Sequence, residues 1–412
     1  MKKRILLKAP ILTQSGYGEH SRFVFRALKE REDLFDIYIE PLEWGKTGWI
    51  WEDSEERKEI DLCIGKFLHL MQSQEQNAFQ ICVYVDLPSA WKRLAPLTIG
   101  VTAGIETDSI SPSWLNPCFT EVDKIIVPSE FSKQGFLNAL DKYKDIFGEQ
   151  VKNNLSQFKN QLDSKISVIG FPIKEYNLTD LNLNFETDFN FLLVAQWGPR
   201  KDIEGTIRNF LQEFKNNSDV GLVVKTNIVR NSVPDRYHTK KRIQAIKNEV
   251  PEAKCKIYLL HGELTNDEIH SLYNNDKIKA MINFGHGEGF GLPLFEAAYC
   301  GVPVITHDFG GQKDFLYANV NGKKKSLFTK IPYEVRPIQS DAVWVGVTEP
   351  DSEWAYIKPI AAKSSMRECY KDHGRFKGQA KKLKEYLLSK DKNESYTKIV
   401  SALAEDVLGN GN

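Results

Sequence analysis

The sequence predicts an α/β protein with two domains. Its 412 residues are more than one hydrophobic core usually spans, and they suit two domains of about 200 residues each. Short apolar runs alternate with amphipathic stretches of helical period along most of the chain, a pattern typical of parallel sheets covered by helices. Several apolar runs end in glycine-rich or charged turns, and open α/β sheets bind their ligands at that edge.

The first domain is expected to span residues 1–173. Its strands are predicted at residues 4–8, 36–39, 80–85, 97–101, 124–127 and 166–169. The first strand runs into Gly16-Tyr17-Gly18, followed by an amphipathic helix that ends near Arg31. Glycines allow the backbone to approach a ligand closely, and a helix N-terminus attracts anions. The glycine loop is therefore a candidate substrate-binding element.

Two later segments of this domain contain aromatic and acidic residues. Residues 44–51 include three tryptophans, which fit either a stacking surface for an acceptor or simply a packed loop; we favour packing. A short acidic helix with a solvated face is expected at residues 52–58. Glu106 and Asp108 follow the strand at 97–101, where two acids are costly unless they are exposed or used.

A polar, asparagine-rich linker is expected at residues 174–188 and a second domain at residues 189–390. The strands of this domain are predicted at 190–195, 220–224, 256–260 and 280–284, and its helices at 203–214, at 236–250 and after Thr265. Arg200 and Lys201 stand between its first strand and first helix, where they can donate to a diphosphate. Lys225 ends the next strand and is a third candidate cation.

The stretch at 285–305 gives the strongest functional signal. After a buried strand, the turn and helix start read Gly287, Glu288, Gly289, Phe290, Gly291, Leu292, Pro293, with Glu296 one helical turn later. Proline is tolerated in a first helical turn and glycine stops a helix, here at Gly301. Glu288 and Glu296 have seven residues between them, so we expect them at opposite ends of one small pocket.

This block closely resembles the E-x7-E signature of the retaining glycosyltransferases of family 4, which have the GT-B fold. The resemblance implies two Rossmann-like domains whose parallel sheets face one another across a cleft. It also implies that Glu288 contacts the donor sugar and Glu296 the ribose hydroxyls of the nucleotide. In the family's G-R-x(4,5)-K-G loop, Lys201 matches the lysine. Gln196 falls near the position of the arginine, so Arg200 is the expected substitute.

The resemblance extends into the first domain, where the glycine loop corresponds to a loop that reaches the donor phosphates and the acceptor. The run V-P-S-E-F at 127–131 also resembles family 4 and implies that Glu106 lies beside the acceptor, at a position where many members have histidine. The candidate catalytic residues are thus Glu106, Glu288, Lys201 and Arg200. The candidate substrate-binding residues are Gly16, Tyr17, Gly18, Lys225, Gly287, Gly289, Phe290, Gly291, Leu292 and Glu296.

The resemblance predicts a hexosyl or pentosyl transferase. It would move a sugar from a UDP- or GDP-type nucleotide-diphosphate sugar to an acceptor hydroxyl, with retention of configuration. The runs SGYGEHSRF, WGKTGW, VTAGIET and DKIIVPSE also resemble glycosyltransferases encoded by tailed bacteriophages and marine viruses. The expected acceptor is a glycan or, in a phage-derived protein, a hydroxymethylated DNA base. The alternatives are a GT-B nucleotide-sugar 2-epimerase and a non-catalytic sugar-nucleotide-binding module.

Composition and charge narrow the partners further. Lys plus Arg equal Asp plus Glu at 55 each, so no net charge attracts nucleic acid or an anionic membrane. The six cysteines form no C-x-x-C pair, so we expect buried thiols. Because the histidines lack ligand spacing and no D-x-D triplet occurs, we expect no metal or other cofactor. No run of 18 apolar residues occurs and Lys8 interrupts the N-terminal apolar stretch, which favours a cytoplasmic protein without a transmembrane segment.

The C-terminal quarter is harder to interpret. Residues 321–349 show no clear pattern, with Lys323-Lys324-Lys325 expected as a surface loop. Residues 358–390 carry ten cations against three acids, which we interpret as a solvated helical face rather than a face for an acidic polymer. A last helix at about 394–408 is expected to pack, with residues 391–412, back on the first domain. Sugar, nucleotide, acceptor and oligomeric state are left open by the sequence.

Overall fold

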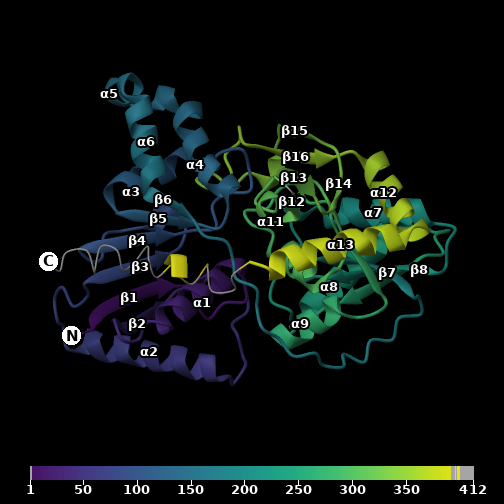
Figure 1. Cartoon of the computed structure of the whole chain (residues 1–412), viewed down its shortest axis with the longest axis horizontal. Helices are drawn as coiled ribbons and strands as arrows, with labels where there is room; N and C mark the ends of the chain where they lie inside the picture. Colours follow the sequence, from purple (N-terminus) through teal and green to yellow (C-terminus); the bar gives the residue numbers. More distant parts are fainter. Residues whose placement is uncertain (1, 321, 391–394, 396, 400–412) are drawn as a thin grey trace. The chain divides into compact units, whose positions relative to one another are not determined.

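The computed structural model describes residues 2–320, 322–390, 395 and 397–399, which form two compact units (Figure 1). The first unit holds residues 1–172 and 344–352 together with the described residues after 391. The second holds residues 173–343 and 353–391. The chain therefore passes between the units four times. Most of the helix predicted at 394–408 lies outside the described residues.

The first unit is built on a parallel six-stranded sheet in the order β2-β1-β3-β4-β5-β6. Its strands are β1 (Lys3–Ala9), β2 (Phe35–Pro41), β3 (Ile81–Val85), β4 (Leu97–Val101), β5 (Lys124–Val127) and β6 (Ile166–Val168). Its helices are α1 (Gly16–Lys29), α2 (Glu55–Gln72), α3 (Leu115–Thr120), α4 (Glu130–Lys142), α5 (Glu149–Asn153) and α6 (Leu155–Lys165), with short 3₁₀ turns at Pro88–Ala90, Pro112–Trp114 and Lys144–Ile146. Central strands such as β3 are buried along their whole length, as expected for a sheet covered on both faces.

The acidic helix predicted at 52–58 is wrong in extent. Helix α2 begins after Ser54, whose side chain accepts from the backbone N–H of Arg57, and it continues to Gln72. Leu62 and Leu68 on this helix are exposed. They interrupt the apolar stripe by which a surface helix is usually recognised in a sequence.

The second unit has its own parallel six-stranded sheet in the order β14-β11-β10-β7-β8-β9. Its strands are β7 (Phe189–Val194), β8 (Val220–Lys225), β9 (Lys256–Leu260), β10 (Ile278–Asn283), β11 (Val304–Thr306) and β14 (Thr329–Lys330). Its helices are α7 (Ile203–Phe214), α8 (Val233–Asn248), α9 (Asn266–Tyr273), α10 (Leu292–Cys300), α11 (Lys313–Leu316), α12 (Pro359–Lys371) and α13 (His373–Leu388), with 3₁₀ turns at Pro199–Lys201 and Ser340–Ala342.

Two antiparallel hairpins complete this unit, β12 (Tyr317–Val320) with β13 (Lys323–Ser326) and β15 (Tyr333–Pro337) with β16 (Glu353–Ile357). The expectation that Lys323-Lys324-Lys325 form a loop is wrong, because they lie in β13. That strand is exposed along its length, so it carries no apolar alternation from which a strand could be predicted.

The residues between β15 and β16 leave their unit and join the first one. Trp114 Nε1 donates to the Gly346 carbonyl oxygen over 2.7 Å, and Ser111 Oγ donates to Glu349 Oε1 over 2.5 Å. Val347 packs against the hydrophobic core of the first unit. The tip of this hairpin, residues 344–352, is therefore a structural part of the first unit.

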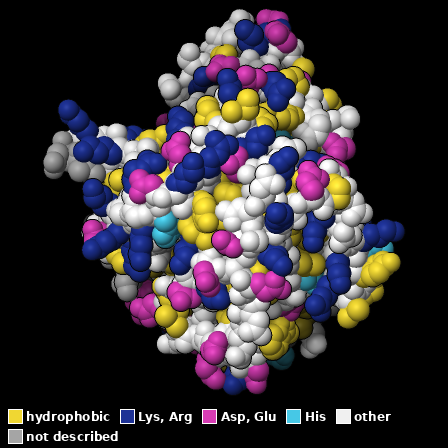
Figure 2. All heavy atoms as spheres, turned by 90° about the vertical axis from the view of Figure 1, so that its right-hand side faces the viewer, with side chains coloured by type: hydrophobic (Ala, Val, Ile, Leu, Met, Phe, Trp, Pro, Cys, Tyr) yellow, Lys and Arg dark blue, Asp and Glu magenta, His cyan; other side chains and the backbone are white. Residues whose placement is uncertain are grey.

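The basic stretch at 358–390 forms α12 and α13, and its charges are mixed with acids. Arg367 Nε pairs with Glu213 over 2.5 Å, and Arg375 pairs with Glu368 over 3.1 Å and with Asp372 over 3.3 Å. Figure 2, which views the right-hand side of Figure 1, shows lysine and arginine interspersed with aspartate and glutamate. These ion pairs are typical of a solvated helical surface.

No helix in the described part of the chain is both long and apolar enough to cross a membrane. All six cysteines are free, and five of them are buried; Cys63 is half-buried. The prediction of unpaired thiols is thus confirmed. Burial raises the pKa of the buried thiols, for example that of Cys255 to about 11, so these groups are inert at neutral pH.

Candidate functional site

A compact charged cluster lies at the carboxyl edge of the second sheet. Lys201 Nζ lies 2.5 Å from Glu288 Oε1, and Arg200 Nη1 lies 3.4 Å from Glu288 Oε2. The carboxylate of Glu288 is almost completely buried, whereas the two cations are partly exposed. With two cations and one carboxylate, these three side chains carry a net charge of +1. The structure thus joins three residues predicted to be catalytic.

The two loops that supply this cluster are in direct backbone contact. Arg200 and Lys201 lie in the 3₁₀ turn after β7, and the N–H of His286 donates to the Arg200 carbonyl oxygen over 2.7 Å. The Arg200 guanidinium in turn donates to the Gly287 carbonyl oxygen over 2.8 Å. A side chain at Gly285 would place its Cβ only 3.0 Å from that Arg200 oxygen. A side chain there would therefore be tight against the Arg200 loop, and glycine favours the close approach.

Asn283 and the turn at Gly310 and Gly311 fix the position of Glu288. Asn283 Nδ2 donates to Glu288 Oε1 over 3.1 Å, and the Gly311 N–H donates to the Glu288 carbonyl oxygen over 2.8 Å. Gly310 has a φ of +134°, which L side chains rarely adopt. Sequence reasoning missed Asn283, although a single amide at the end of an apolar strand is a signal that could have found it.

The electrostatics of the cluster keep Glu288 ionised. Burial by itself would raise the pKa of this carboxyl group, but the charges of Lys201 and Arg200 and the hydrogen bonds from Lys201 and Asn283 outweigh it and lower the pKa to about 2. A buried carboxylate held in this way is a fixed acceptor. It cannot act as a general acid at neutral pH.

Glu296 occupies a second polar position on α10. Its carboxylate lies 3.2 Å from Lys174 Nζ and accepts from the Tyr273 hydroxyl over 3.3 Å. It is almost fully buried, so these partners compensate for the loss of hydration. Lys174 was not singled out from the sequence; it is the first residue of the predicted linker and is followed directly by Glu175, so it gives no distinct signal.

The turn between β10 and α10 presents mostly backbone. Gly287 and Gly289 are buried with the rest of the turn. The ring of Phe290 packs against Phe295 and Phe315 at centroid distances of 5.3 and 5.2 Å. Gly291 has a φ of +90° and precedes Leu292, the first residue of α10, whose first turn includes Pro293. The predicted position of Pro293 in the first turn and the predicted stop at Gly301, which has a φ of +87°, are confirmed.

Lys225 ends β8, as predicted, and its ammonium group donates to the Gly262 carbonyl oxygen in the loop after β9, over 2.6 Å. Burial lowers the pKa of Lys225 to about 8. The structure thus brings Lys225 to the neighbouring loop of the sheet, where it keeps much of its positive charge at pH 7.

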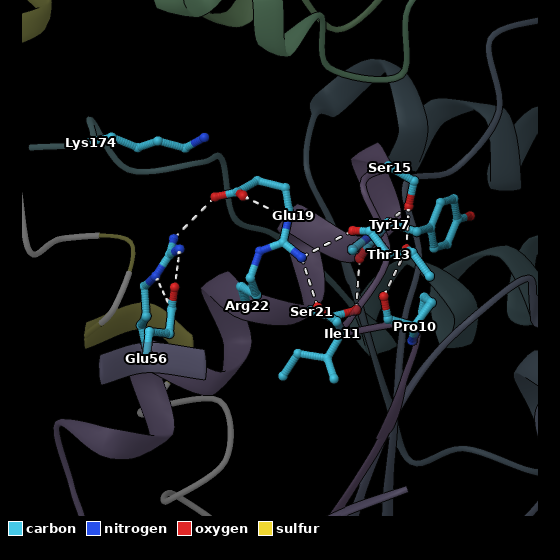
Figure 3. A network of polar contacts seen from close by, with 12 residues as sticks. Pro10, Ile11, Thr13, Ser15, Tyr17, Glu19, Ser21, Arg22, Glu56 and Lys174 are labelled. Carbon is cyan, nitrogen blue, oxygen red and sulfur yellow. Dashed lines mark hydrogen bonds and ion pairs between the residues drawn. The ribbon is translucent and has the colours of Figure 1, made fainter. Parts of the chain in front are cut away.

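In the first unit, the glycine loop is held by a buried arginine that sequence reasoning missed (Figure 3). Arg22 Nη1 donates to the carbonyl oxygens of Ile11 and Thr13 over 2.7 and 3.0 Å, and Nη2 pairs with Glu19 over 3.2 Å. A Cβ added to Gly18 would lie 2.0 Å from the Thr13 oxygen. Gly18 is therefore required for close packing, whereas Gly16 is exposed and has open space around it.

Tyr17 connects the glycine loop to the other loops at this edge of the first sheet. Its hydroxyl lies 2.7 Å from Thr102 Oγ1, at the end of β4, and its ring stacks on Trp44 with centroids 3.9 Å apart. Burial raises the pKa of Tyr17, and the charge of Glu106 adds to this in smaller part. Glu106 is half-buried in the loop after β4. Tyr17, Thr102 and Glu106 therefore belong to one loop cluster.

Comparison with known proteins bears on both units. Residues 180–324 match the model of the family "Glycosyl transferases group 1". No curated protein sequence matches the chain.

Among the residues that the structure describes, no group of three or more His, Cys, Asp or Glu is placed to hold a metal ion.

Solved structures resemble the whole chain. A structure of HepE from Anabaena in complex with UDP and glucose has a TM-score of 0.59 and 14% identity, over 98% of this chain and 100% of that one. Sucrose-phosphate synthase from Thermosynechococcus elongatus has a TM-score of 0.61 and 13% identity, over 99% and 100%. The lipopolysaccharide outer core galactosyltransferase WaaB has a TM-score of 0.52 and 12% identity, over 98% and 100%.

The fold is GT-B, with two parallel six-stranded sheets, and the predicted fold class is confirmed. The match to the glycosyltransferase family lies within the second unit, and the fold of the whole chain is the one found in these solved structures. The matched segment includes Arg200, Lys201, Glu288 and Glu296, so the clustered residues belong to the part of the chain that resembles the family.

Proposed function

We propose that the protein transfers a sugar from a UDP-sugar to a hydroxyl group of an acceptor, with retention of configuration. The observation that carries the proposal is the cluster of Lys201, Arg200 and Glu288, next to the start of α10. It offers two cations to a diphosphate and one fixed carboxylate to sugar hydroxyls. The family match at 180–324 supports this assignment.

The chemistry requires stabilisation of a leaving diphosphate. The bond between the sugar C1 and the diphosphate oxygen breaks, a bond from C1 to the acceptor oxygen forms, and the acceptor hydroxyl releases its proton. The products are the glycosylated acceptor, the nucleoside diphosphate and a proton. Lys201 and Arg200, aided by Lys225 and by backbone N–H groups at the start of α10, neutralise the charge that develops on the diphosphate. Glu288 and Glu296 orient the sugar and the ribose.

UDP is the proposed nucleotide because structural neighbours were solved with it. HepE was solved with UDP and glucose and, in another structure, with UDP-glucose at a TM-score of 0.58 and 13% identity. Glu106, beside Tyr17, is the proposed acceptor-side residue. Because side-chain cations supply the charge, we propose that no metal is required, and activity should persist when EDTA is present.

The test begins with a thermal-shift screen of nucleotide sugars, followed by assays of donor hydrolysis and transfer. Lys201→Ala should lower kcat/KM by about 10- to 150-fold, because a charge-assisted hydrogen bond contributes about 1.5–3 kcal/mol. Glu288→Gln should remove transfer with little change in shape. Lys215→Ala is the matched control, since Lys215 is an exposed lysine of the same unit whose nearest acid, Glu252, is 4.0 Å away.

Each outcome discriminates between functions. Full activity in both Lys201→Ala and Glu288→Gln, with circular dichroism unchanged, contradicts the proposal. Isomerisation of the donor sugar without an acceptor would identify a nucleotide-sugar 2-epimerase. Donor binding without hydrolysis or transfer to any acceptor would identify a binding module.

A further inference from the structure

The loop after β2 exposes two large aromatic side chains. In this loop, residues 44–51, Trp49 is 50% exposed and Trp51 is 65% exposed. Ile50, between them, packs against the core of the first unit. Ile50 thus packs inward, while the indoles on either side of it are exposed to solvent. The interpretation of this segment as a packed loop is wrong for these two tryptophans and holds only for Trp44, whose ring stacks on Tyr17.

The backbone under these indoles is held in place. Residue Trp49 forms an isolated antiparallel bridge with Thr13. On either side of it, the Gln14 N–H donates to the Gly48 oxygen over 2.8 Å and the Ile50 N–H donates to the Leu12 oxygen over 2.7 Å. The loop is therefore fastened to the glycine loop that Arg22 holds. Exposed aromatic side chains on a fixed backbone mark interaction sites, because exposure of a large apolar patch is otherwise unfavourable.

The same loop contacts the residues expected at the acceptor. Trp44 stacks on Tyr17 with an interplanar angle of 22°, and Tyr17 is hydrogen-bonded to Thr102 at the end of β4. The two exposed indoles thus belong to the loops that follow the strands of this sheet. Open α/β sheets bind ligands at that edge.

The charge around the two indoles selects between classes of acceptor. Residues 40–58 contain six acids against Lys46, Arg57 and Lys58, an excess of three negative charges. Glu40 pairs with Lys8 and Glu56 with Arg26, each over 2.6 Å. Asp53 and Glu55 both pair with Lys58, over 3.9 and 2.8 Å, and their side chains remain 89% and 88% exposed. A phosphate backbone is repelled by such a surface, whereas the carboxylates accept hydrogen bonds from sugar hydroxyls.

We propose that Trp49 and Trp51 form a binding platform for an uncharged oligosaccharide, which is the acceptor of the transfer. The apolar C–H faces of sugar rings lie on the indoles and remove apolar area from water. The neighbouring carboxylates bind hydroxyl groups. That the bound saccharide is the acceptor rests on the proposed function. Binding of the saccharide itself does not require the donor.

The first experiment measures binding without donor, on an array of neutral and anionic glycans, with calorimetry for each glycan retained. The wild type should bind neutral oligosaccharides, and Trp49→Ala or Trp51→Ala should each weaken binding about tenfold, from the apolar area that one ring covers. Trp344→Ala is the matched control, because Trp344 is also 65% exposed in the same unit but lies outside the platform. It should bind as the wild type does.

The second experiment separates acceptor binding from donor chemistry. In Trp49→Ala and Trp51→Ala, KM for the retained oligosaccharide should rise about tenfold, while kcat, UDP affinity and acceptor-independent donor hydrolysis stay unchanged. Trp49→Tyr should recover most of the affinity. If the wild type neither hydrolyses nor transfers the donor sugar but glycan binding depends on the two indoles, the proposed transferase function fails and the platform stands.

Three results would overturn the platform. The first is that no neutral glycan binds, or that binding is unaffected by both substitutions. The second is that an oligonucleotide containing 5-hydroxymethylcytosine binds more tightly than any neutral glycan and loses affinity in the same variants. The third is that sedimentation shows a dimer of the wild type that both substitutions dissociate, which would make the two indoles a contact between copies of the chain.

Discussion

The loops at the carboxyl edges of the two sheets differ in how they are built. In the second unit, Glu288 is 7% exposed and is held between Lys201 and Arg200. In the first unit, Arg22 holds the glycine loop through hydrogen bonds to neutral carbonyl oxygens. The neighbouring loop, residues 44–51, exposes Trp49 and Trp51. The family match covers residues 180–324, all within the second unit. The second unit thus presents a buried ionic site at this edge, and the first unit presents an exposed aromatic surface.

The largest effect is expected from Gly18→Ala, which tests whether shape governs the first unit. A Cβ there would lie 2.0 Å from the Thr13 carbonyl oxygen, so the loop or α1 must move, and we expect a loss of at least about 3 kcal/mol in unfolding free energy. Urea unfolding followed by circular dichroism measures it. Gly16→Ala is the control, because nothing lies within 4 Å of a Cβ at Gly16, and equal stability of the two variants would refute this dependence on shape.

Glu288→Gln tests whether charge governs the second unit. The folded pKa of about 2 lies below the ordinary value of 4.5, so the carboxylate stabilises the fold above about pH 4.5 and that contribution is lost as the pH falls towards 2. This contribution of the carboxylate to the free energy of unfolding amounts to about 3 kcal/mol. Between pH 5 and pH 2.5, the wild type should therefore lose more stability than Glu288→Gln. Glu204→Gln, at a surface pair with Arg208, should follow the wild type; parallel pH curves for all three proteins would contradict the prediction.

Arg22→Met should lower the free energy of opening of the glycine loop by about 2 kcal/mol, because charge-assisted hydrogen bonds to two carbonyl oxygens are lost. Hydrogen exchange of residues 10–18 measures this opening directly. Arg31→Met removes a surface pair with Asp33 and should leave the exchange unchanged. Unaltered protection of the loop in Arg22→Met would mean that other contacts hold it.

The smallest effect is expected from His20→Phe, and it is stabilising. Both ring nitrogens of His20 are buried without a hydrogen-bond partner, and burial lowers its pKa from 6.5 to about 4. An apolar ring removes this unsatisfied group, which should raise the unfolding free energy by about 1 kcal/mol at pH 7. Because the unfolded chain takes up the proton first, the wild type should also lose stability between pH 6.5 and 4 that the variant keeps. A destabilised variant would show that the imidazole has a partner in solution.

Much of the fold could be predicted from local sequence patterns. Helix α7 (Ile203–Phe214) and strands β4 (Leu97–Val101) and β9 (Lys256–Leu260) have the predicted bounds, because amphipathic periods and apolar runs reflect burial within a parallel sheet. The hairpins between Tyr317 and Ile357 were missed. In each hairpin one strand is largely exposed, β13 and β15, and antiparallel pairing with another segment leaves little local signal.

In the candidate site, too, some residues could be predicted from the sequence and others could not. Arg200, Lys201 and Glu288 were predicted from their residue types next to strand ends and from the resemblance to family 4. Asn283 and Arg22 were not, because each acts through a contact with a loop elsewhere in the chain. The exposure of Trp49 also could not be predicted, since a cluster of tryptophans gives the same sequence signal whether it is packed or exposed.

The hairpin tip at residues 344–352 has a practical consequence for genetic dissection of the protein. A recombinant fragment that ends at residue 172 would lack Val347 from its core and leave Trp114 Nε1 without the Gly346 carbonyl oxygen. Such a fragment should be less soluble than one that is co-expressed with the missing segment. Because each unit contains segments from separate parts of the chain, a single truncation cannot isolate either one intact. Adding a peptide of residues 344–352 to the fragment, and measuring how far its solubility recovers, would test directly how this segment completes the first unit.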